Sequence, residues 1–327
     1  MYTKRYIWLA ILLVGVAFGA NAAKRKFVQN PVNHFITISL GGGEANTVSK
    51  FVIPESKDLI GAAGNFGFGY ELRKNSFFFG LGAQAEITYT GQRLGDFVEP
   101  FQRIDFEHDP HVYSYRYSGF TDIQRTLQLG VPVYFGYYFN QYVYGMLGAK
   151  FDYSFLMLHA AVTHLTTDGT YPRFAEPITD RPRYGFYPDD IYGYAGAAIG
   201  VMKVGPTLEV GAKLPIYTAS RRFGMRVGLY AAYLFPLEFV NNIPLVDYTR
   251  VNQKPESLNK EDLKKNIVFN SPLNSPYQEK PAQYLEIGLH ITFLFNVTPV
   301  HKLCNCDTDN GIHPVRSAGR PNGLIMK

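Results

Sequence analysis

The chain has 327 residues, a formal net charge of +5, and 15% aromatic but only 18% charged residues. Its 24 tyrosines, 25 phenylalanines and 31 glycines favour strands and disfavour a helical protein. Lysine and arginine are dispersed rather than clustered, which disfavours a nucleic-acid-binding protein, and the mean hydropathy is too polar for a bundle of membrane helices.

The N-terminus has the pattern of an export signal. Lys4 and Arg5 precede an apolar run at 6–18, and the Ala-Asn-Ala sequence at 20–22 fits a small-x-small cleavage site. We therefore expect residues 1–22 to be a cleaved signal peptide. The alternative is an uncleaved anchor helix, but the apolar run is shorter than the roughly 20 residues that span a bilayer.

Apolar residues at every second position predict strands, because successive side chains of a strand point to opposite faces. Tight turns fit Asn75-Ser76 and Asn140-Gln141, and polar segments at 44–61 and 92–111 read as loops. In the first half of the chain the alternation predicts strands at 34–41, 64–74 and 77–89, followed by a hairpin of two strands at 123–155.

The second half continues the alternation. It predicts one long strand at 192–216, a short turn near Ala219, and strands at 225–233 and 284–295, with polar segments at 166–190 and 240–281. Long and short connections therefore alternate, as in an up-and-down transmembrane β-barrel with both ends in the periplasm. The count is eight antiparallel strands; ten result if 156–165 pairs separately.

The predicted barrel divides the chain into four parts. After the signal peptide, residues 23–33 form a periplasmic lead-in, and 34–297 form the barrel with its long extracellular loops. Residues 298–327 show no alternation and are expected to form a C-terminal periplasmic tail.

The hairpin at 123–155 shows why lipid should surround the barrel. Leu127, Leu129 and Val131 continue an apolar face, whereas the other face is small or charged. An eight-stranded barrel is just filled by its side chains, so the charged faces of the strands should form an ion-pair network in the lumen. The predicted lumen set is Glu71, Arg73, Gln84, Glu86, Gln128, Lys150, Asp152, Glu209, Lys213, Arg226, Glu286 and His290.

An ion-conducting or gated pore is the alternative interpretation of these charges. A wide porin is disfavoured, because aqueous channels usually need 16 to 18 strands.

Three segments resemble a known family. LQLGVPVYFGYYF with YVYGMLGAKFDYSF, LEVGAKLPI with RVGLYAAYLF, and the closing YLEIGLHITFLF are similar to hairpins of small outer-membrane barrels of the OmpA/OmpX type, in their Bacteroidetes-like versions. The resemblance implies a Gram-negative outer membrane and a closing strand read by the barrel-assembly machinery. We expect no peptidoglycan-binding domain of the kind that many OmpA-like proteins carry, and residues 298–327 continue past the closing strand.

Other chemical motifs are weak. Asp105, Glu107, His108, Asp109 and His111 could form a metal or general-base cluster, but a solvated loop is favoured. Cys304 and Cys306 form a possible thiol pair in the tail. We therefore predict no catalytic residue, no metal site and no cofactor.

The expected function is non-enzymatic: a structural or interaction role at the cell envelope, including membership of an outer-membrane complex. The alternatives are a narrow solute or ion pore, an accessory subunit of a secretion or uptake system, and a rim-sited enzyme. The expected partners are outer-membrane lipid or lipopolysaccharide, the assembly machinery during biogenesis, and other outer-membrane or periplasmic proteins, but no nucleic acid.

Overall fold

The computed structural model describes residues 32–104, 110–181, 186–198, 200–214, 223–248 and 264–298. The predicted signal peptide, most of the lead-in and tail, the turn near Ala219, Cys304, Cys306 and the 105–109 part of the acidic loop lie outside these residues. In the described part of the chain, no helix is long and apolar enough to cross a membrane.

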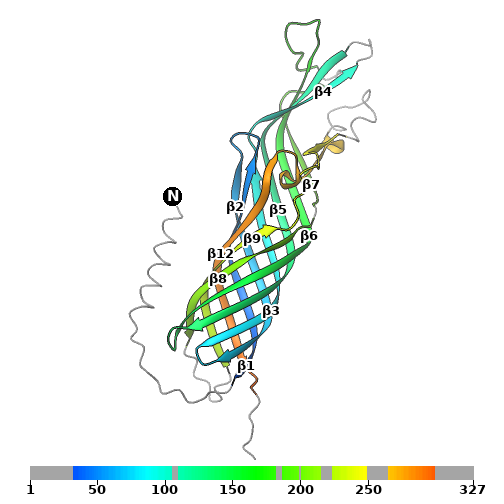
Figure 1. The fold of residues 1–327 in the computed structure, drawn as a ribbon. Helices are drawn as coiled ribbons and strands as arrows, with labels where there is room; N and C mark the ends of the chain where they lie inside the picture. Colours follow the sequence, from blue (N-terminus) through cyan, green and yellow to red (C-terminus); the bar gives the residue numbers. More distant parts are fainter. Residues whose placement is uncertain are drawn as a thin grey trace, which may run out of the picture.

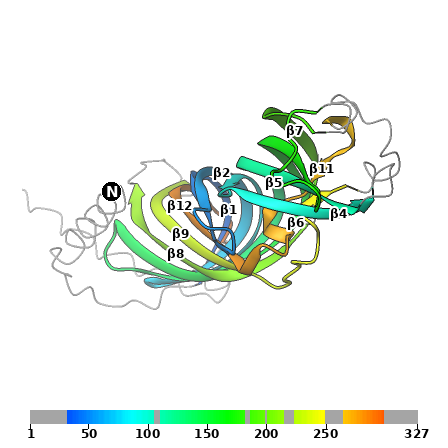
Figure 2. The ribbon, with the colours of Figure 1, turned by 90° about the horizontal axis from the view of Figure 1, so that it is seen from above.

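Eight antiparallel strands close into a ring in the order β1-β2-β3-β5-β6-β8-β9-β12 and back to β1 (Figures 1 and 2). The prediction of an up-and-down eight-stranded barrel is therefore confirmed. The strands are β1 (Asn33–Phe51), β2 (Lys57–Lys74), β3 (Phe77–Arg93), β5 (Pro110–Tyr138), β6 (Val143–Thr170), β8 (Met202–Leu214), β9 (Phe223–Pro236) and β12 (Gln278–Asn296).

The turns after β2 and β5 lie at one end of the ring, which we call the turn end. Asn75 adopts a positive φ of 56° in the first turn, a conformation that asparagine tolerates well. In the second, the side-chain oxygen of Asn140 accepts hydrogen bonds from the backbone N–H groups of Tyr142 and Val143, both at 2.7 Å. Both tight turns are where the sequence predicts them.

The outer surface of the ring is apolar. Each strand presents large hydrophobic side chains outward, as expected for a barrel that spans a bilayer. Examples from six strands are Phe68, Leu81, Leu129, Phe151, Leu208 and Leu289, all of them exposed.

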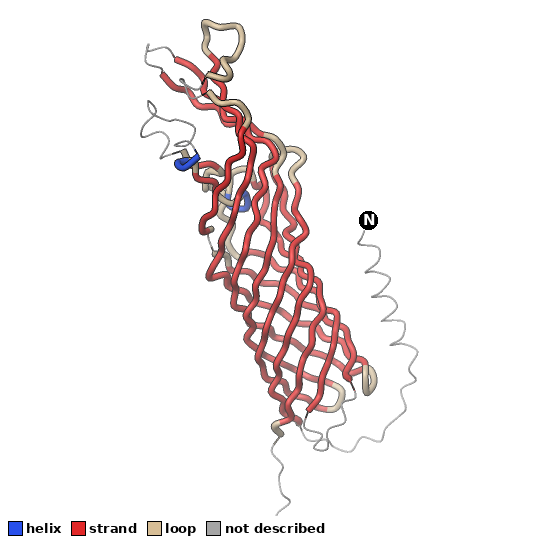
Figure 3. Tube along the Cα trace, turned by 180° about the vertical axis from the view of Figure 1, so that it is seen from behind, coloured by secondary structure: helices blue, strands red, loops and turns tan. Residues whose placement is uncertain are grey.

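The opposite end extends far beyond the ring (Figures 1 and 3). Two extra strands flank the long β5–β6 hairpin there: β4 (Phe97–Ile104) pairs with β5, and β7 (Asp190–Ala197) pairs with β6. We call this four-stranded sheet the ribbon, and this end of the barrel the ribbon end.

Three loop or strand predictions are corrected by the ribbon end. The predicted loop at 44–61 is mostly strand, because β1 and β2 continue upward and leave only 52–56 as the connection. The predicted loop at 92–111 contains β4. The predicted strand at 192–216 is interrupted at 198–201, so that β7 and β8 pair with different parts of β6.

The segment before β12 was predicted to be polar loop, but it is partly folded against the ribbon. It carries the short pair β10 (Val246–Asp247) and β11 (Val268–Phe269) and the 3-10 helix η2 (Pro272–Asn274). Its apolar side chains join an aromatic core with those of the ribbon. Members of this ribbon core include Phe97, Tyr115, Tyr117, Phe120, Leu245 and Phe269, all of them buried.

Candidate functional site: the charged lumen

The structure places all twelve residues of the predicted lumen set on the inner face of the ring. Arg73, Gln84, Lys213 and His290 are partly exposed. The other eight are fully buried: Glu71, Glu86, Gln128, Lys150, Asp152, Glu209, Arg226 and Glu286. They group into two clusters, one near the turn end and one halfway along the lumen.

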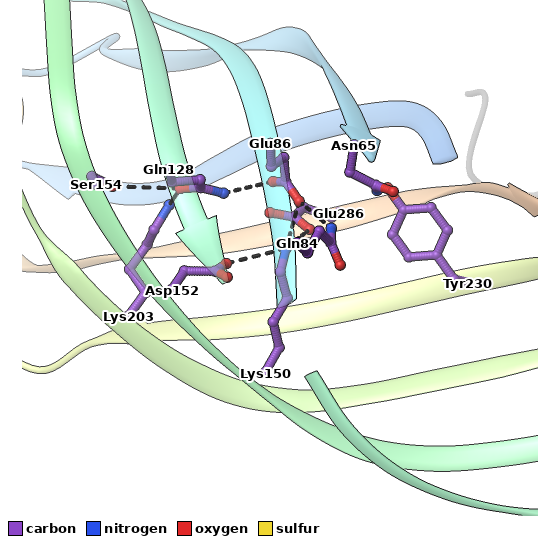
Figure 4. Close-up of polar contacts among 10 residues, drawn as sticks. All are labelled: Asn65, Gln84, Glu86, Gln128, Lys150, Asp152, Ser154, Lys203, Tyr230 and Glu286. Carbon is purple, nitrogen blue, oxygen red and sulfur yellow. Dashed lines mark hydrogen bonds and ion pairs between the residues drawn. The ribbon is translucent and has the colours of Figure 1, made fainter. Parts of the chain in front are cut away.

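Lys150 is the centre of the middle cluster (Figure 4). Its Nζ lies 2.6 Å from Glu86 Oε2 on β3, 3.0 Å from Glu286 Oε2 on β12, and 3.1 Å from Asp152 Oδ2 on its own strand, β6. Charge-assisted hydrogen bonds of this kind are the stronger ones in proteins. Because β3, β6 and β12 lie on different sides of the ring, one ammonium group crosslinks the barrel across its lumen.

Gln128 extends this cluster toward the ribbon end. Its Nε2 donates to Glu86 Oε1 at 2.6 Å, and its Oε1 accepts from Lys203 Nζ at 2.6 Å. Lys203 was absent from the predicted set, which took its first residue of this strand at Glu209. Lys203 is buried, and extending the alternation back from Glu209 by three steps would have found it.

The middle cluster contains three carboxylates, those of Glu86, Asp152 and Glu286, against the two ammonium groups of Lys150 and Lys203. Their carboxylate oxygens lie within 4.8 Å of one another, a spacing that could hold a metal ion. Lys150 Nζ, however, contacts all three carboxylates. The lysine therefore occupies the position that a cation would take.

The lower cluster lies near the turn end and centres on Arg226. Arg226 is 1% exposed, and its Nη2 lies 2.8 Å from Glu71 Oε2. Arg73 Nη2 binds the other oxygen of Glu71 at 3.0 Å. The second carboxylate of this cluster, Glu209, contacts His290 Nδ1 at 2.7 Å and accepts a hydrogen bond from Tyr144.

Glycines in neighbouring strands make room for the lower cluster. Gly80 and Gly136 lie opposite Tyr134 and Phe78, and the two rings fold over them, where a Cβ would collide with the ring atoms. The Phe78 ring lies over Gly136, and the guanidinium Cζ of Arg226 lies 4.7 Å from the centroid of this ring. This arrangement combines close packing with a cation–π contact.

A cavity of about 80 Å³ separates the two clusters. Residues of both clusters line it, among them Lys150, Glu286, Glu209 and Arg226. This volume holds a few water molecules, which could satisfy Arg226 Nε and Nη1, two buried groups without a protein partner. The lumen is therefore packed rather than open along its length.

A third polar layer closes the lumen at the ribbon end. Asp122 Oδ1 lies 2.9 Å from His159 Nδ1, and Gln124 Nε2 donates to Asp122 Oδ2 at 3.0 Å and to Ser271 Oγ at 2.6 Å. The sequence prediction missed this layer because it began the inner face of β5 at Gln128. Extending the same alternation back by two and three steps would have found Gln124 and Asp122.

Above this layer, a partly buried carboxylate joins the ribbon core. Glu99 on β4 accepts hydrogen bonds from Tyr248 at 2.7 Å and Tyr277 at 3.1 Å. Burial raises the pKa of the Glu99 carboxyl, although the two hydroxyl groups act against that rise. Burial also raises the pKa values of Tyr117 and Tyr248, which hydrogen-bond to each other. His111, from the predicted acidic loop, stacks on Tyr171 at 4.7 Å.

The comparisons with known proteins find only distant structural similarity. No family model matches the chain, and no curated protein matches it. Neisserial surface protein A (NspA) is 10% identical, with a TM-score of 0.30, covering 79% of this chain and 95% of its own. Ail, the attachment invasion locus protein of Yersinia pestis, is 11% identical, with a TM-score of 0.21, covering 81% of this chain and 97% of its own. The fold assignment therefore rests on the closed ring of strands itself.

Proposed function

We propose that this chain is a non-enzymatic barrel of a bacterial outer membrane that anchors the ribbon outside the cell. The ring would lie in the bilayer, with the turn end in the periplasm and the ribbon end at the surface. The protein would then serve a structural or interaction role at the envelope, with the ribbon as its contact surface.

One observation carries the proposal: Lys150 binds two carboxylates across the lumen, those of Glu86 and Glu286, and the cavity beside it measures about 80 Å³. A solute path would need these ion pairs to separate, and leaving buried charges unpaired costs several kcal/mol. A filled lumen favours an anchor over a pore. The ribbon supports the interaction role, because an extension beyond the ring is not needed to complete the barrel.

Planar-bilayer recording of the purified chain tests the filled lumen. We expect no stable conductance for the native sequence. The variant E86A/K150A/E286A, which removes the crosslink, should conduct if it closes as a ring. Large and stable conductance by the unaltered chain would overturn the proposal.

Cysteine labelling tests the orientation. In a C304S/C306S background, a membrane-impermeant maleimide should label Glu176→Cys on intact cells, because Glu176 is exposed at the ribbon end. Asn140→Cys, in the turn after β5, should label only after the cells are broken. The reverse pattern would place the ribbon in the periplasm.

A further inference from the structure

Three cations gather on the outer wall of the barrel, on the adjacent strands β2, β3 and β5. Lys57 lies directly opposite Arg93, and Arg93 lies opposite Thr121 on β5. Arg125 lies further down the same face of β5. All three cations are exposed and point away from the lumen.

In the described part of the chain, no carboxylate forms an ion pair with this group. Among the residues that the structure describes, none of Lys57, Arg93 and Arg125 has a carboxylate oxygen within the 4.0 Å of an ion pair. Like charges directly opposite on paired strands are unfavourable. By contrast, exposed Lys50 on β1 pairs with Glu279.

The group lies in the upper part of the apolar surface, where exposed Ile123 stands between Arg125 and Thr121 on β5. Arg125 is opposite Tyr89, and its Cζ lies 5.6 Å from the centroid of that ring. Below Tyr89, β3 presents Ile87 and Leu81 outward. Aromatic rings with a polar tip favour the headgroup level of a bilayer. The three cations therefore lie at and just above that level on the ribbon side.

We propose that Lys57, Arg93 and Arg125 bind the phosphate groups of an anionic lipid of the outer leaflet. Guanidinium groups bind phosphate oxygens in bidentate fashion, and a lysine adds a point charge. The acyl chains would lie along the apolar wall below, past Ile87 and Leu81. The site rests on the proposed orientation, because it requires the ribbon side to face a phosphorylated leaflet.

Native mass spectrometry of the purified full chain tests the site, with diphosphoryl lipid A as the probe and phosphatidylcholine as the neutral reference. The chain should retain lipid A at least about tenfold more tightly than phosphatidylcholine, and the variant K57Q/R93Q/R125Q should lose about tenfold of that affinity. The matched control K50Q/K74Q/K280Q, which removes the same number of exposed cations elsewhere, should bind like the native chain. Arg93→Gln alone should show a partial loss and provides the test if the triple variant fails to fold.

Two results would overturn the site: equal lipid A retention by the K57Q/R93Q/R125Q and K50Q/K74Q/K280Q variants, or equal retention of dephosphorylated lipid A. Displacement of lipid A by millimolar inorganic phosphate would assign the site to free phosphate instead. Because binding is measured in detergent, it does not depend on conductance. If the native chain conducts ions but binds lipid A selectively, only the filled lumen is contradicted. If it does not conduct and shows no preference for lipid A over phosphatidylcholine, only the lipid site is contradicted.

Discussion

The lumen and the ribbon core share strands β5 and β6, yet their chemistry is opposite. Along β5, the buried inner position within the ring is Gln128, whereas further up the buried positions are Tyr115 and Tyr117. The outer face changes as well, from exposed Leu129 on the ring to exposed Arg116 on the ribbon. Along β5, the inner face is therefore polar and the outer face apolar within the ring, whereas in the ribbon the inner face is apolar and the outer face polar.

The difference shows that the surrounding solvent, rather than the strand, decides which face is apolar. Where lipid covers the outside, apolar side chains are satisfied there and the enclosed charges pair with each other. Where water covers the outside, burial of aromatic rings provides the stabilisation. The lumen should thus depend on complete charge pairing, and the ribbon core on packed volume.

Loss of the central charge should have the largest effect. Lys150→Met leaves three carboxylates without their shared cation, and removing one partner of a buried ion pair costs about 3–5 kcal/mol. Urea unfolding in detergent micelles, followed by the gel mobility of the heat-modifiable band, measures it. Lys50→Met, which removes an exposed cation of similar size, is the control and should cost less than about 1 kcal/mol. Equal effects of the two substitutions would mean that the lumen charges contribute no special stability.

Loss of packed volume in the ribbon core should come next. Leu245 is 1% exposed, so Leu245→Ala should destabilise its segment by about 2–4 kcal/mol through lost burial and a residual cavity. The effect should be local. Limited proteolysis should cut the segment before β12 faster, while the gel mobility of the folded ring stays unchanged. Unfolding of the whole barrel by this substitution would show that the two regions are one cooperative unit.

A neutral replacement inside the lumen should cost little, in contrast to Lys150→Met. Glu286→Gln leaves two carboxylates against the two ammonium groups, and the amide oxygen can still accept a hydrogen bond from Lys150. We expect a change of less than about 1 kcal/mol in the same urea unfolding. A loss as large as that of Lys150→Met would mean that all three carboxylates are needed in charged form.

The smallest effect concerns pH in the ribbon. Burial raises the pKa of the Glu99 carboxyl above its ordinary value. The folded ribbon core therefore binds the proton of this carboxyl more tightly than the unfolded chain does. This contribution is complete below the ordinary pKa of the carboxyl and is lost as the pH rises through the raised value. Proteolysis of the segment before β12 should therefore be a few-fold faster at pH 7 than at pH 4.

Glu99→Gln is the control for this pH effect. The amide keeps an acceptor for Tyr248 but cannot ionise, so the cleavage rate should become independent of pH over this range. A pH dependence that survives in the variant would assign the effect to another group.

The sequence predicted the ring well because lipid imposes a strict period of two on the strands. The hairpin at 123–155, both tight turns and the inward direction of Lys150 and Asp152 all follow from that period. The ribbon was missed for a physical reason. A strand in lipid is expected to alternate apolar outer positions with polar inner ones. The ribbon part of β5 has tyrosines on its inner face and polar residues on its outer face, so its sequence was interpreted as a loop.

The individual contacts in the lumen could not be predicted. Alternation places a side chain inside the barrel, but the partner across the lumen depends on the stagger of the strands. Lys150 contacts Glu86 and Glu286, which are far away in the sequence. Lys203 was missed for a different reason: it has the parity of Glu209 and Lys213 on β8, but the predicted lumen set took no residue of this strand before Glu209.

The seam between β1 and β12 has a consequence for biogenesis. Phe35 pairs with Asn296, so the first and last strands of the ring are each other's neighbours. The hydrogen bonds that close the ring therefore join its first and last strands, which are the strands of the ring farthest apart in the sequence. Contacts between such distant residues form slowly, so closure should be a late step of folding. Until β12 pairs with β1, β1 keeps an open hydrogen-bonding edge that a bilayer does not tolerate. If the chain is exported as proposed above, truncated chains should fail to insert and be degraded in the periplasm, so that only full-length molecules reach the membrane.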